Sequence, residues 1–257
     1  MLEFRDVRFR YESARSTTEV LRGVSFACNA DEIVAVVGPS GCGKSTLLGM
    51  AAGLRKPLSG EIVVNGRVAD GPDRALGILF QHNTLFPWRS VQENVELGLE
   101  VRGVAKRDRR ARGSALIEQY GLAGFERKYP HALSGGMQKR VALIQTLAME
   151  PEILLLDEPF GTLDAQTRLT IEDDVVQICR TSKRAMLLVT HDIAEAISIA
   201  DRIVVLTKRP ATVKAIFDVP LSRRAGSVHD VQGMPEFSSY FREVWDALDI
   251  SLPALAG

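Results

Sequence analysis

The sequence predicts an α/β fold built on a parallel sheet, with a small antiparallel sheet near the N-terminus and an inserted helical segment. The main observation is a set of short, strongly apolar runs at 32–38, 152–158 and 185–191. Such runs are typical of strands buried on both faces of a parallel sheet, and a helix-like segment follows each of them. A further apolar run at 202–206 predicts another strand of the same sheet.

The region around the first of these runs has a different pattern. Residues 61–69 alternate around Asn65-Gly66, a dipeptide that favours a two-residue hairpin turn because both turn positions need a positive φ. Together with the segments 1–11 and 23–29, this hairpin predicts a small antiparallel sheet. Asp31 occupies a turn position that also needs left-handed geometry, which aspartate tolerates.

From about residue 83 to 150 the pattern is mainly helical and contains no buried-strand run, so we expect a helical subdomain inserted into the α/β core. We assign residues 1–220, including this insert, to one domain. The tail, 221–257, contains an amphipathic helix, for which packing on the chain's own core is favoured over a dimer contact or a regulatory role. The apolar side chains at helical spacing are Phe237, Phe241, Val244, Trp245 and Leu248.

Composition is that of an ordinary globular protein of 257 residues, 46% apolar and 25% charged. Basic and acidic residues balance at 32 each, which argues against a nucleic-acid partner because such proteins usually carry a basic excess. The three cysteines fit neither a disulfide framework nor a metal spacing, so we expect a reducing cytoplasm. The apolar runs are too short to cross a bilayer, and no secretory signal is recognisable at the N-terminus. Any membrane role is therefore expected to depend on a partner.

Residues 38–46 read GPSGCGKST and satisfy the phosphate-loop pattern G-x-x-x-x-G-K-[ST]. The predicted strand before the loop and helix after it are the required context, because backbone N–H groups and the helix N-terminus then converge on one phosphate group. Lys44 can reach the β- and γ-phosphates, Ser45 can bind Mg²⁺, and Thr46 can contact the α-phosphate. We assign nucleotide binding to the whole loop: Gly38, Pro39, Ser40, Gly41, Cys42, Gly43, Lys44, Ser45 and Thr46.

The apolar run at 152–158 ends in two acidic residues, Asp157 and Glu158. Ligands of open α/β sheets bind at the carboxyl ends of the strands. Asp157 is suited to hold Mg²⁺. Glu158 is one residue further along, points elsewhere because side chains alternate along a strand, and is suited to deprotonate an attacking water. Two acids that merely end a strand are the alternative, and the phosphate loop in the same sheet favours the functional interpretation.

A second anion site is predicted in LSGGMQKRVALIQTLAMEP, at 133–151. Ser134 is a favourable N-cap residue, and two glycines and an apolar repeat at helical spacing follow it. The start of such a helix binds anions. Because the phosphate loop already surrounds its own nucleotide, we expect the second site to serve another phosphate. An ordinary capped helix is the alternative.

These motifs together resemble the ATP-binding cassette (ABC) ATPases, whose elements occur here in the same order over about residues 1–220, with LSGGM matching the signature loop. The resemblance implies a P-loop NTPase fold in which two copies pair head to tail around two ATP molecules. Each ATP would lie between the phosphate loop of one copy and the signature loop of the other, so one chain holds half of each site. The signature loop comprises Ser134, Gly135, Gly136 and Met137, and much of the wider family has glutamine at the last of these positions.

The resemblance also implies roles outside these loops. Tyr11 would stack on adenine, although a core aromatic on an edge strand is the alternative. Gln81 would contact Mg²⁺ and water and sense the transporter partner, and Asp164 would lie in the loop that crosses the dimer interface. His191 would contact the γ-phosphate and position Glu158, a packed histidine being the alternative. The implied cofactors are ATP and Mg²⁺, with Ser45, Gln81 and Asp157 on the metal and Glu158, His191 and Gln81 in catalysis.

The stretch LFPWRSVQENVELGL (85–99), with the signature segment and DEPFGTLDAQTR, resembles most closely the ATPases of bacterial nitrate, sulfonate and taurine importers. This implies an ATP-hydrolysing subunit, peripheral at the cytoplasmic face of the inner membrane. Its partners would be a second copy of the chain, integral-membrane permease subunits that insert a short helix near 85–88 and, indirectly, a periplasmic or extracellular solute-binding protein. The alternative is a soluble ABC ATPase of DNA repair or translation, which the single cassette and the lack of heptads disfavour. The transported solute is left open.

Overall fold

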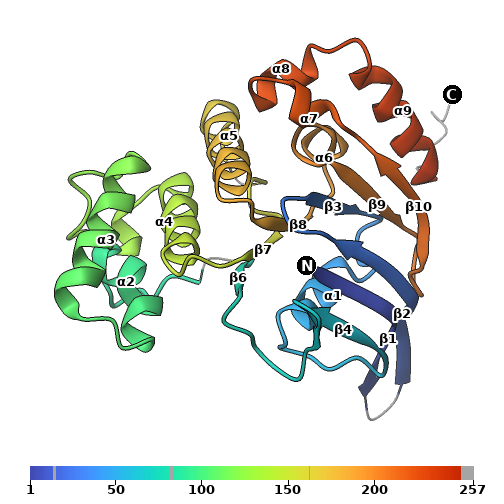
Figure 1. Ribbon diagram of the computed structural model, residues 1–257, viewed down its shortest axis with the longest axis horizontal. Helices are drawn as coiled ribbons and strands as arrows, with labels where there is room; N and C mark the ends of the chain where they lie inside the picture. Colours follow the sequence, from blue (N-terminus) through green and yellow to red (C-terminus); the bar gives the residue numbers. More distant parts are fainter. Residues whose placement is uncertain (14–15, 82–83, 162, 250–257) are drawn as a thin grey trace, which may run out of the picture.

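Figure 1 shows the computed structural model of the chain, which describes residues 1–13, 16–81, 84–161 and 163–249. Its central sheet has the strand order β10-β9-β3-β8-β7-β6. The strands are parallel except β10, which pairs antiparallel with β9. Their bounds are β3 (Ile33–Val37), β6 (Leu76–Leu79), β7 (Ile153–Asp157), β8 (Ala185–Val189), β9 (Arg202–Leu206) and β10 (Val213–Asp218). The parallel strands expected from the apolar runs are therefore confirmed.

The edge strand β6 was not expected from the sequence. It has only four residues, LGIL, and two of them, Leu76 and Ile78, are only half-buried. Gly77 lets the strand approach its neighbours closely, because a Cβ there would lie 2.6 Å from Cγ of Pro151. Pairing of β6 with β7 places the end of this strand beside Asp157 and Glu158.

The predicted antiparallel sheet is also present, in the order β2-β1-β4-β5. Its strands are β1 (Leu2–Ser13), β2 (Ser16–Cys28), β4 (Ser59–Val64) and β5 (Arg67–Val68). Asn65 and Gly66 join β4 to β5 with φ values of 48° and 79°, as the hairpin prediction requires. Asp31 has a φ of 57° and so occupies the left-handed turn expected of it.

The helices are α1 (Lys44–Ala51), α2 (Val91–Val101), α3 (Lys106–Gln119), α4 (Gly135–Leu147), α5 (Ala165–Thr181), α6 (Ile193–Ile199), α7 (Leu221–Arg224), α8 (Val228–Gln232) and α9 (Phe237–Ala247), with a 3₁₀ turn at Pro130–Ala132. In Figure 1, α2, α3 and α4 form a group at the left, beyond the β6 end of the central sheet. Within the described ranges, no helix is both long enough and apolar enough to span a membrane.

Alternate residues of β3 face two different cores. Ile33 and Val37 belong to the core that includes the helices α5, α6 and α9, whereas Val34 and Val36 belong to the core shared with α1 and the antiparallel sheet. All five residues of β3 are buried. A strand covered on both faces needs apolar side chains at every position, which is why this segment reads as a continuous apolar run.

Helix α9 packs on the core that includes α6. Val244 is fully buried and Leu248, just after the helix, is 8% exposed. Phe237, Phe241 and Trp245 are partly buried at the edge of the same core. The helical spacing of these five side chains is therefore explained by packing within the chain.

Candidate functional site

A hollow of about 550 Å³ lies where β3 ends and α1 begins. It brings together residues that the sequence assigned to several separate motifs, and it adds Val20 and Arg209, which sequence reasoning did not single out. The residues that line it are Tyr11, Val20, Ser40, Gly41, Gly43, Lys44, Ser45, Thr46, Gln81, Glu158, His191 and Arg209. Most of the predicted nucleotide and catalytic side chains therefore meet in one place.

The phosphate loop needs its glycines for backbone geometry. Gly41 and Gly43 have φ values of 72° and 121°, which residues with a side chain rarely adopt. A Cβ on Gly43 would also lie 2.7 Å from Cγ1 of Val20. Lys44 is 7% exposed, and its Nζ donates to the carbonyl oxygen of Gly38 at 2.7 Å and to that of Pro39 at 3.3 Å. The loop is thus closed around the lysine ammonium.

Cys42 is the predicted loop residue that faces away from the hollow. It is 2% exposed and belongs to the core between α1 and the antiparallel sheet. Burial raises the pKa of its thiol, and the nearby positive charge of Lys44 opposes this increase. Like Gly38 and Pro39, it does not line the hollow, so these three residues shape the loop.

Ser45 and Asp157 form the part of the site suited to a metal ion. Oγ of Ser45 donates to Oδ1 of Asp157 at 3.1 Å. Asp157 is 5% exposed, and burial raises its pKa, while the hydrogen bond from Ser45 opposes that shift. These oxygen donors fit Mg²⁺, which is commonly held by one or two carboxylates together with substrate phosphates. The described residues contain no group of three or more His, Cys, Asp or Glu that could hold a metal ion.

Glu158 lies between Gln81 and His191. Its Oε1 is 3.1 Å from Nδ1 of His191, and its Oε2 accepts a hydrogen bond of 2.9 Å from Nε2 of Gln81. Strand β7 ends one residue earlier, and Glu158 itself has a φ of 45°, in the left-handed region. The direction of its side chain therefore comes from a turned backbone in addition to the strand alternation expected from sequence. Backbone strain of this kind is concentrated at functional sites.

Tyr11 lines the hollow beside the last residue of the phosphate loop, Thr46. It is 41% exposed, so it is not a core aromatic. Its hydroxyl is 3.1 Å from Oγ1 of Thr46, and the guanidinium carbon of Arg55 lies 5.4 Å from the centre of its ring. The tyrosine thus borders the phosphate loop, and its stacking on adenine stays a prediction.

The signature loop does not line the hollow of its own chain. Ser134 caps α4, as predicted, and its side chain accepts a hydrogen bond from the backbone N–H of Met137 at 3.3 Å. A Cβ on Gly136 would lie 3.4 Å from Cδ2 of Leu163. The loop therefore lies beside the start of α5, and its residues Ser134 and Gly135 are exposed.

Asp164 caps α5 in the same region. Its Oδ1 accepts a hydrogen bond from the backbone N–H of Thr167 at 3.0 Å, and this hydrogen bond holds the pKa of Asp164 below its usual value. Asp164 is exposed and is not one of the residues of the hollow. The contact observed for Asp164 is thus the helix cap, and the interface role expected of it stays a prediction.

Lys139 is a residue that sequence reasoning missed. It is on α4 and is 7% exposed. Its Nζ donates to the carbonyl oxygens of Phe80, at 3.3 Å, and Gln81. Burial lowers the pKa of Lys139, and the charges of Asp157 and Glu158 act against that shift. The signal in the sequence was a lysine on a helix that is otherwise mostly apolar, but the carbonyl groups it binds are distant along the chain.

Comparison of the chain with known proteins identifies its family. A family model described as ABC transporter matches residues 21–161. The chain is 37% identical over 247 residues to the nitrate import ATP-binding protein NrtD of Synechocystis sp., covering 95% of this chain and 94% of that protein. It is 46% identical over 204 residues to the aliphatic sulfonates import ATP-binding protein SsuB of Bacillus licheniformis, covering 79% of each.

A solved structure gives the same result for the fold. The dimeric post-hydrolysis state of the ATP-binding cassette MJ0796, bound to ADP and Pi, superposes with a TM-score of 0.78 at 29% identity. The match covers 85% of this chain and 99% of that one. The α/β core, the antiparallel sheet and the helical group thus form a cassette of this type.

Proposed function

Because this chain belongs to the ABC transporter family and is an ATPase of that family, we propose that it is the ATP-hydrolysing subunit of a bacterial importer. The observation that carries the proposal is Glu158, held between Gln81 and His191 at the phosphate loop. Two relatives are named as import proteins for nitrate and for aliphatic sulfonates. Their names support uptake of a small solute of the nitrate or sulfonate kind, and we keep taurine in the proposed range.

The residues of the hollow fit ATP hydrolysis as follows. The phosphate loop and the N-terminus of α1 bind the phosphates, and Lys44 supplies a positive charge beside them. The carboxylate of Glu158 accepts a proton from the attacking water, while His191 holds that carboxylate from one side and Gln81 from the other. Ser45 and Asp157 would hold Mg²⁺, which would neutralise part of the charge on the phosphates when bound.

We further propose that the site is completed by a second copy of the chain. The signature residues Ser134, Gly135 and Gly136 lie outside the hollow, although the start of α4 is an anion-binding element. A head-to-tail pair would bring that helix start to the γ-phosphate bound by the other copy. The solved dimer of a similar cassette, bound to ADP and Pi, supports pairing of two copies.

The surface that follows Gln81 along the chain is our candidate for contact with the permease. Leu85 is 9% exposed, so it packs inside the chain, whereas Trp88 is 70% exposed. The rings of Phe86 and Trp88 lie 5.1 Å apart. A large exposed aromatic of this kind is typical of an interface. The apolar segment that we expect to contact the permease is thus divided: Leu85 lies in the core and Trp88 at the surface.

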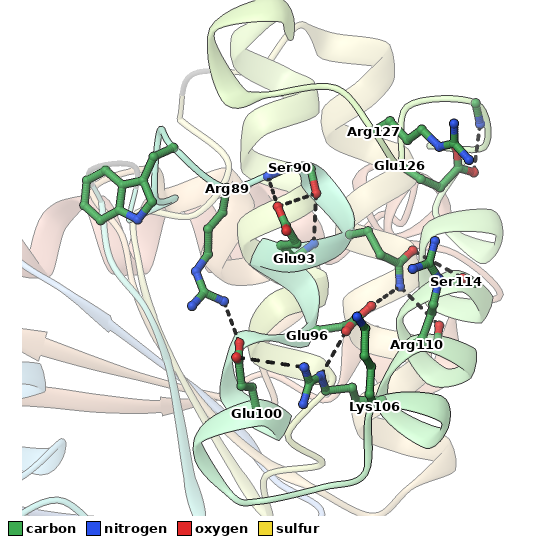
Figure 2. Close-up of a pocket in the computed structure, with 14 residues that line it drawn as sticks. Arg89, Ser90, Glu93, Glu96, Glu100, Lys106, Arg110, Ser114, Glu126 and Arg127 are labelled. Carbon is green, nitrogen blue, oxygen red and sulfur yellow. Dashed lines mark hydrogen bonds and ion pairs between the residues drawn. The ribbon is translucent and has the colours of Figure 1, made fainter.

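Trp88 also borders a second hollow, of about 730 Å³, beside α2 and α3 (Figure 2). Ion pairs fix its polar walls: Arg89 with Glu100 at 2.6 Å and Arg109 with Glu96 at 3.1 Å. A permease helix that covers Trp88 would meet these charged side chains at the edge of the contact. A permease partner would keep the chain peripheral at the cytoplasmic face of the membrane and couple it indirectly to a solute-binding protein.

The proposal is tested with the Glu158→Gln variant, which should bind Mg-ATP without hydrolysing it. Size-exclusion chromatography with light scattering is expected to show a dimer with Mg-ATP and a monomer without nucleotide. Adding Ser134→Arg to this variant blocks the helix start and should restore the monomer, while ATP still binds. A Glu158→Gln protein that stays monomeric with Mg-ATP, both alone and with the membrane subunits, would overturn the shared-site assignment.

A further inference from the structure

We propose that Arg209 is a nucleotide-binding residue whose guanidinium group contacts the phosphates of ATP or ADP in the hollow. The inference rests on the nucleotide site of the proposed function. It adds to that site a cation that belongs to none of the motifs recognised in the sequence.

The position of Arg209 is the first argument. It follows β9, at the carboxyl end of a parallel strand, where ligands of such sheets bind. It lines the same hollow as Lys44 and Tyr11. Its Nη2 and Cζ atoms would lie 3.2 Å and 3.9 Å from a Cβ built on Gly41. Because Gly41 has no side chain, the guanidinium group lies directly beside the backbone of the phosphate loop.

The backbone that carries Arg209 is held on both sides. The N–H of Thr207 donates to the carbonyl oxygen of Thr212 at 3.0 Å, which closes the turn between β9 and β10. The N–H of Ala211 donates to the carbonyl oxygen of Val20 at 2.8 Å, and Arg22 donates back to Ala211 at 2.9 Å. These bonds attach the turn to β2, so a ligand would order little more than the arginine side chain itself.

The charge of Arg209 has no acidic partner among the residues that the structure describes. Other arginines near this sheet are paired: Arg180 with Asp201 at 2.6 Å and Arg202 with Glu32 at 3.1 Å. No carboxylate lies within 4.0 Å of Arg209 in the described part of the chain. Its positive charge therefore adds to that of Lys44 on the phosphate side of the hollow.

The chemistry of the side chain then selects the ligand group. A guanidinium group is always charged and donates two parallel hydrogen bonds to phosphate oxygens. Adenine and ribose offer no negative charge. If Arg209 contacts the phosphates, its removal should weaken the binding of ATP and ADP but not that of adenosine. If it contacts the base or the sugar, its removal should weaken the binding of all three ligands equally.

The test measures the dissociation constants of ATP, ADP and adenosine for the full-length chain in EDTA, which prevents turnover, with adenosine measured by competition. Arg209→Gln is expected to weaken ATP and ADP by roughly tenfold and to leave adenosine unchanged, as for one lost charge-assisted hydrogen-bonding group. Arg209→Lys should keep part of the affinity. Lys208→Gln removes the neighbouring exposed charge and should change none of the constants.

Each contrary result has a distinct meaning. Equal weakening of adenosine and ATP by Arg209→Gln would assign the residue to the base or sugar and overturn the proposal. Arg209→Gln could instead leave the nucleotide affinities unchanged but abolish the Mg-ATP dimer of the Glu158→Gln variant. That result would assign Arg209 to contact with the partner copy and would also overturn the proposal. Lys44→Ala serves as the reference: if it binds ATP like the unmodified chain, the nucleotide site itself is wrong. If Lys44→Ala loses ATP and Arg209→Gln does not, only the assignment of Arg209 fails.

Discussion

Nδ1 of His191 lies 3.1 Å from Oε1 of Glu158, although the two residues are carried by different strands. Those strands, β7 and β8, are parallel neighbours, with Asp157 paired to Val189. On the other side of β7, β6 leads to Gln81, which donates to the same carboxylate. The ends of three adjacent strands therefore surround the proposed base.

The first prediction concerns that carboxylate. Glu158→Gln keeps the size of the side chain but removes its ability to accept a proton, so ATP turnover should fall by about 10²-fold or more while the affinity for ATP stays the same. Phosphate release measures the first quantity and equilibrium nucleotide binding the second. Glu152→Gln, at the residue just before β7 and outside the hollow, is the matched control and should retain full turnover.

The second prediction concerns completion of the site by another copy. Lys44→Ala disables the phosphate loop, and Ser134→Arg disables the signature loop, so each variant alone should be nearly inactive. An equimolar mixture allows one intact site per mixed dimer, formed by Lys44 of one chain and Ser134 of the other. ATPase activity should therefore reappear on mixing. Independent sites within single chains would leave the mixture as inactive as its components.

The third prediction concerns Lys139, whose ammonium group binds the carbonyls of Phe80 and Gln81. Lys139→Met leaves these acceptors without their donor and should lower the free energy of unfolding by about 1–3 kcal/mol. It should also lower kcat more than it changes KM for ATP, because Gln81 loses its backbone support. Urea denaturation and steady-state kinetics measure the two effects.

Lys208→Met is the control for this variant, since Lys208 is exposed and should change neither quantity. A loss of stability without a change in kcat would mean that Lys139 is purely structural. Recovery of kcat in Lys139→Arg would support the positioning role, because arginine also donates to carbonyl oxygens.

The fourth prediction is a pH dependence of stability that arises from two buried acids. Burial raises the pKa of Glu195 to about 8 and that of Glu172 to about 7, from a usual value of 4.5. The charges of Glu172 and Asp192 raise the pKa of Glu195 further, while Thr190 and Arg168 act in the opposite direction. Between pH 4.5 and 8 the folded chain thus binds more protons than the unfolded chain.

Stability should therefore fall as the pH rises through this window, by about 1.4 kcal/mol per pH unit for each proton held only by the folded chain. The contribution is most favourable below pH 4.5 and is lost above pH 8. Glu195→Gln should raise Tm relative to the unmodified chain at pH 8.5 and change it little at pH 5. Glu118→Gln, at an exposed position, should have no effect, and equal shifts at both pH values for Glu195→Gln would contradict the prediction.

Sequence patterns predicted the strands and the phosphate loop because the responsible interactions are local. The continuous apolar run before Gly38 predicts a strand buried on both faces, and Asn65-Gly66 predicts the turn that it forms. Ser134 and Asp164 are N-cap residues, which mark the starts of α4 and α5 by their own local hydrogen bonds. The metal and base assignments of Asp157 and Glu158 combined such patterns with a family resemblance, and they stay predictions.

Other features escaped prediction because they depend on contacts between distant segments. The strand β6 is short and half-buried, and its pairing with β7 is what defines it. Lys139 finds its acceptors about 58 residues away along the chain. Arg209 reaches the phosphate loop only because β9 lies next to β3 in the sheet. No local pattern in the sequence contains this information.

By itself, the sequence determined that the chain has a phosphate loop between a buried strand and a helix, a second helix start rich in small residues, and acids at a strand end. Spacing and side-chain chemistry are sufficient for these because each depends on neighbours along the chain. Only the tertiary structure decided that Gln81, Glu158 and His191 meet, that Arg209 borders the loop, and that Ser134 lies outside the hollow. Strand order and core packing decide these relationships, because they fix which distant segments lie side by side.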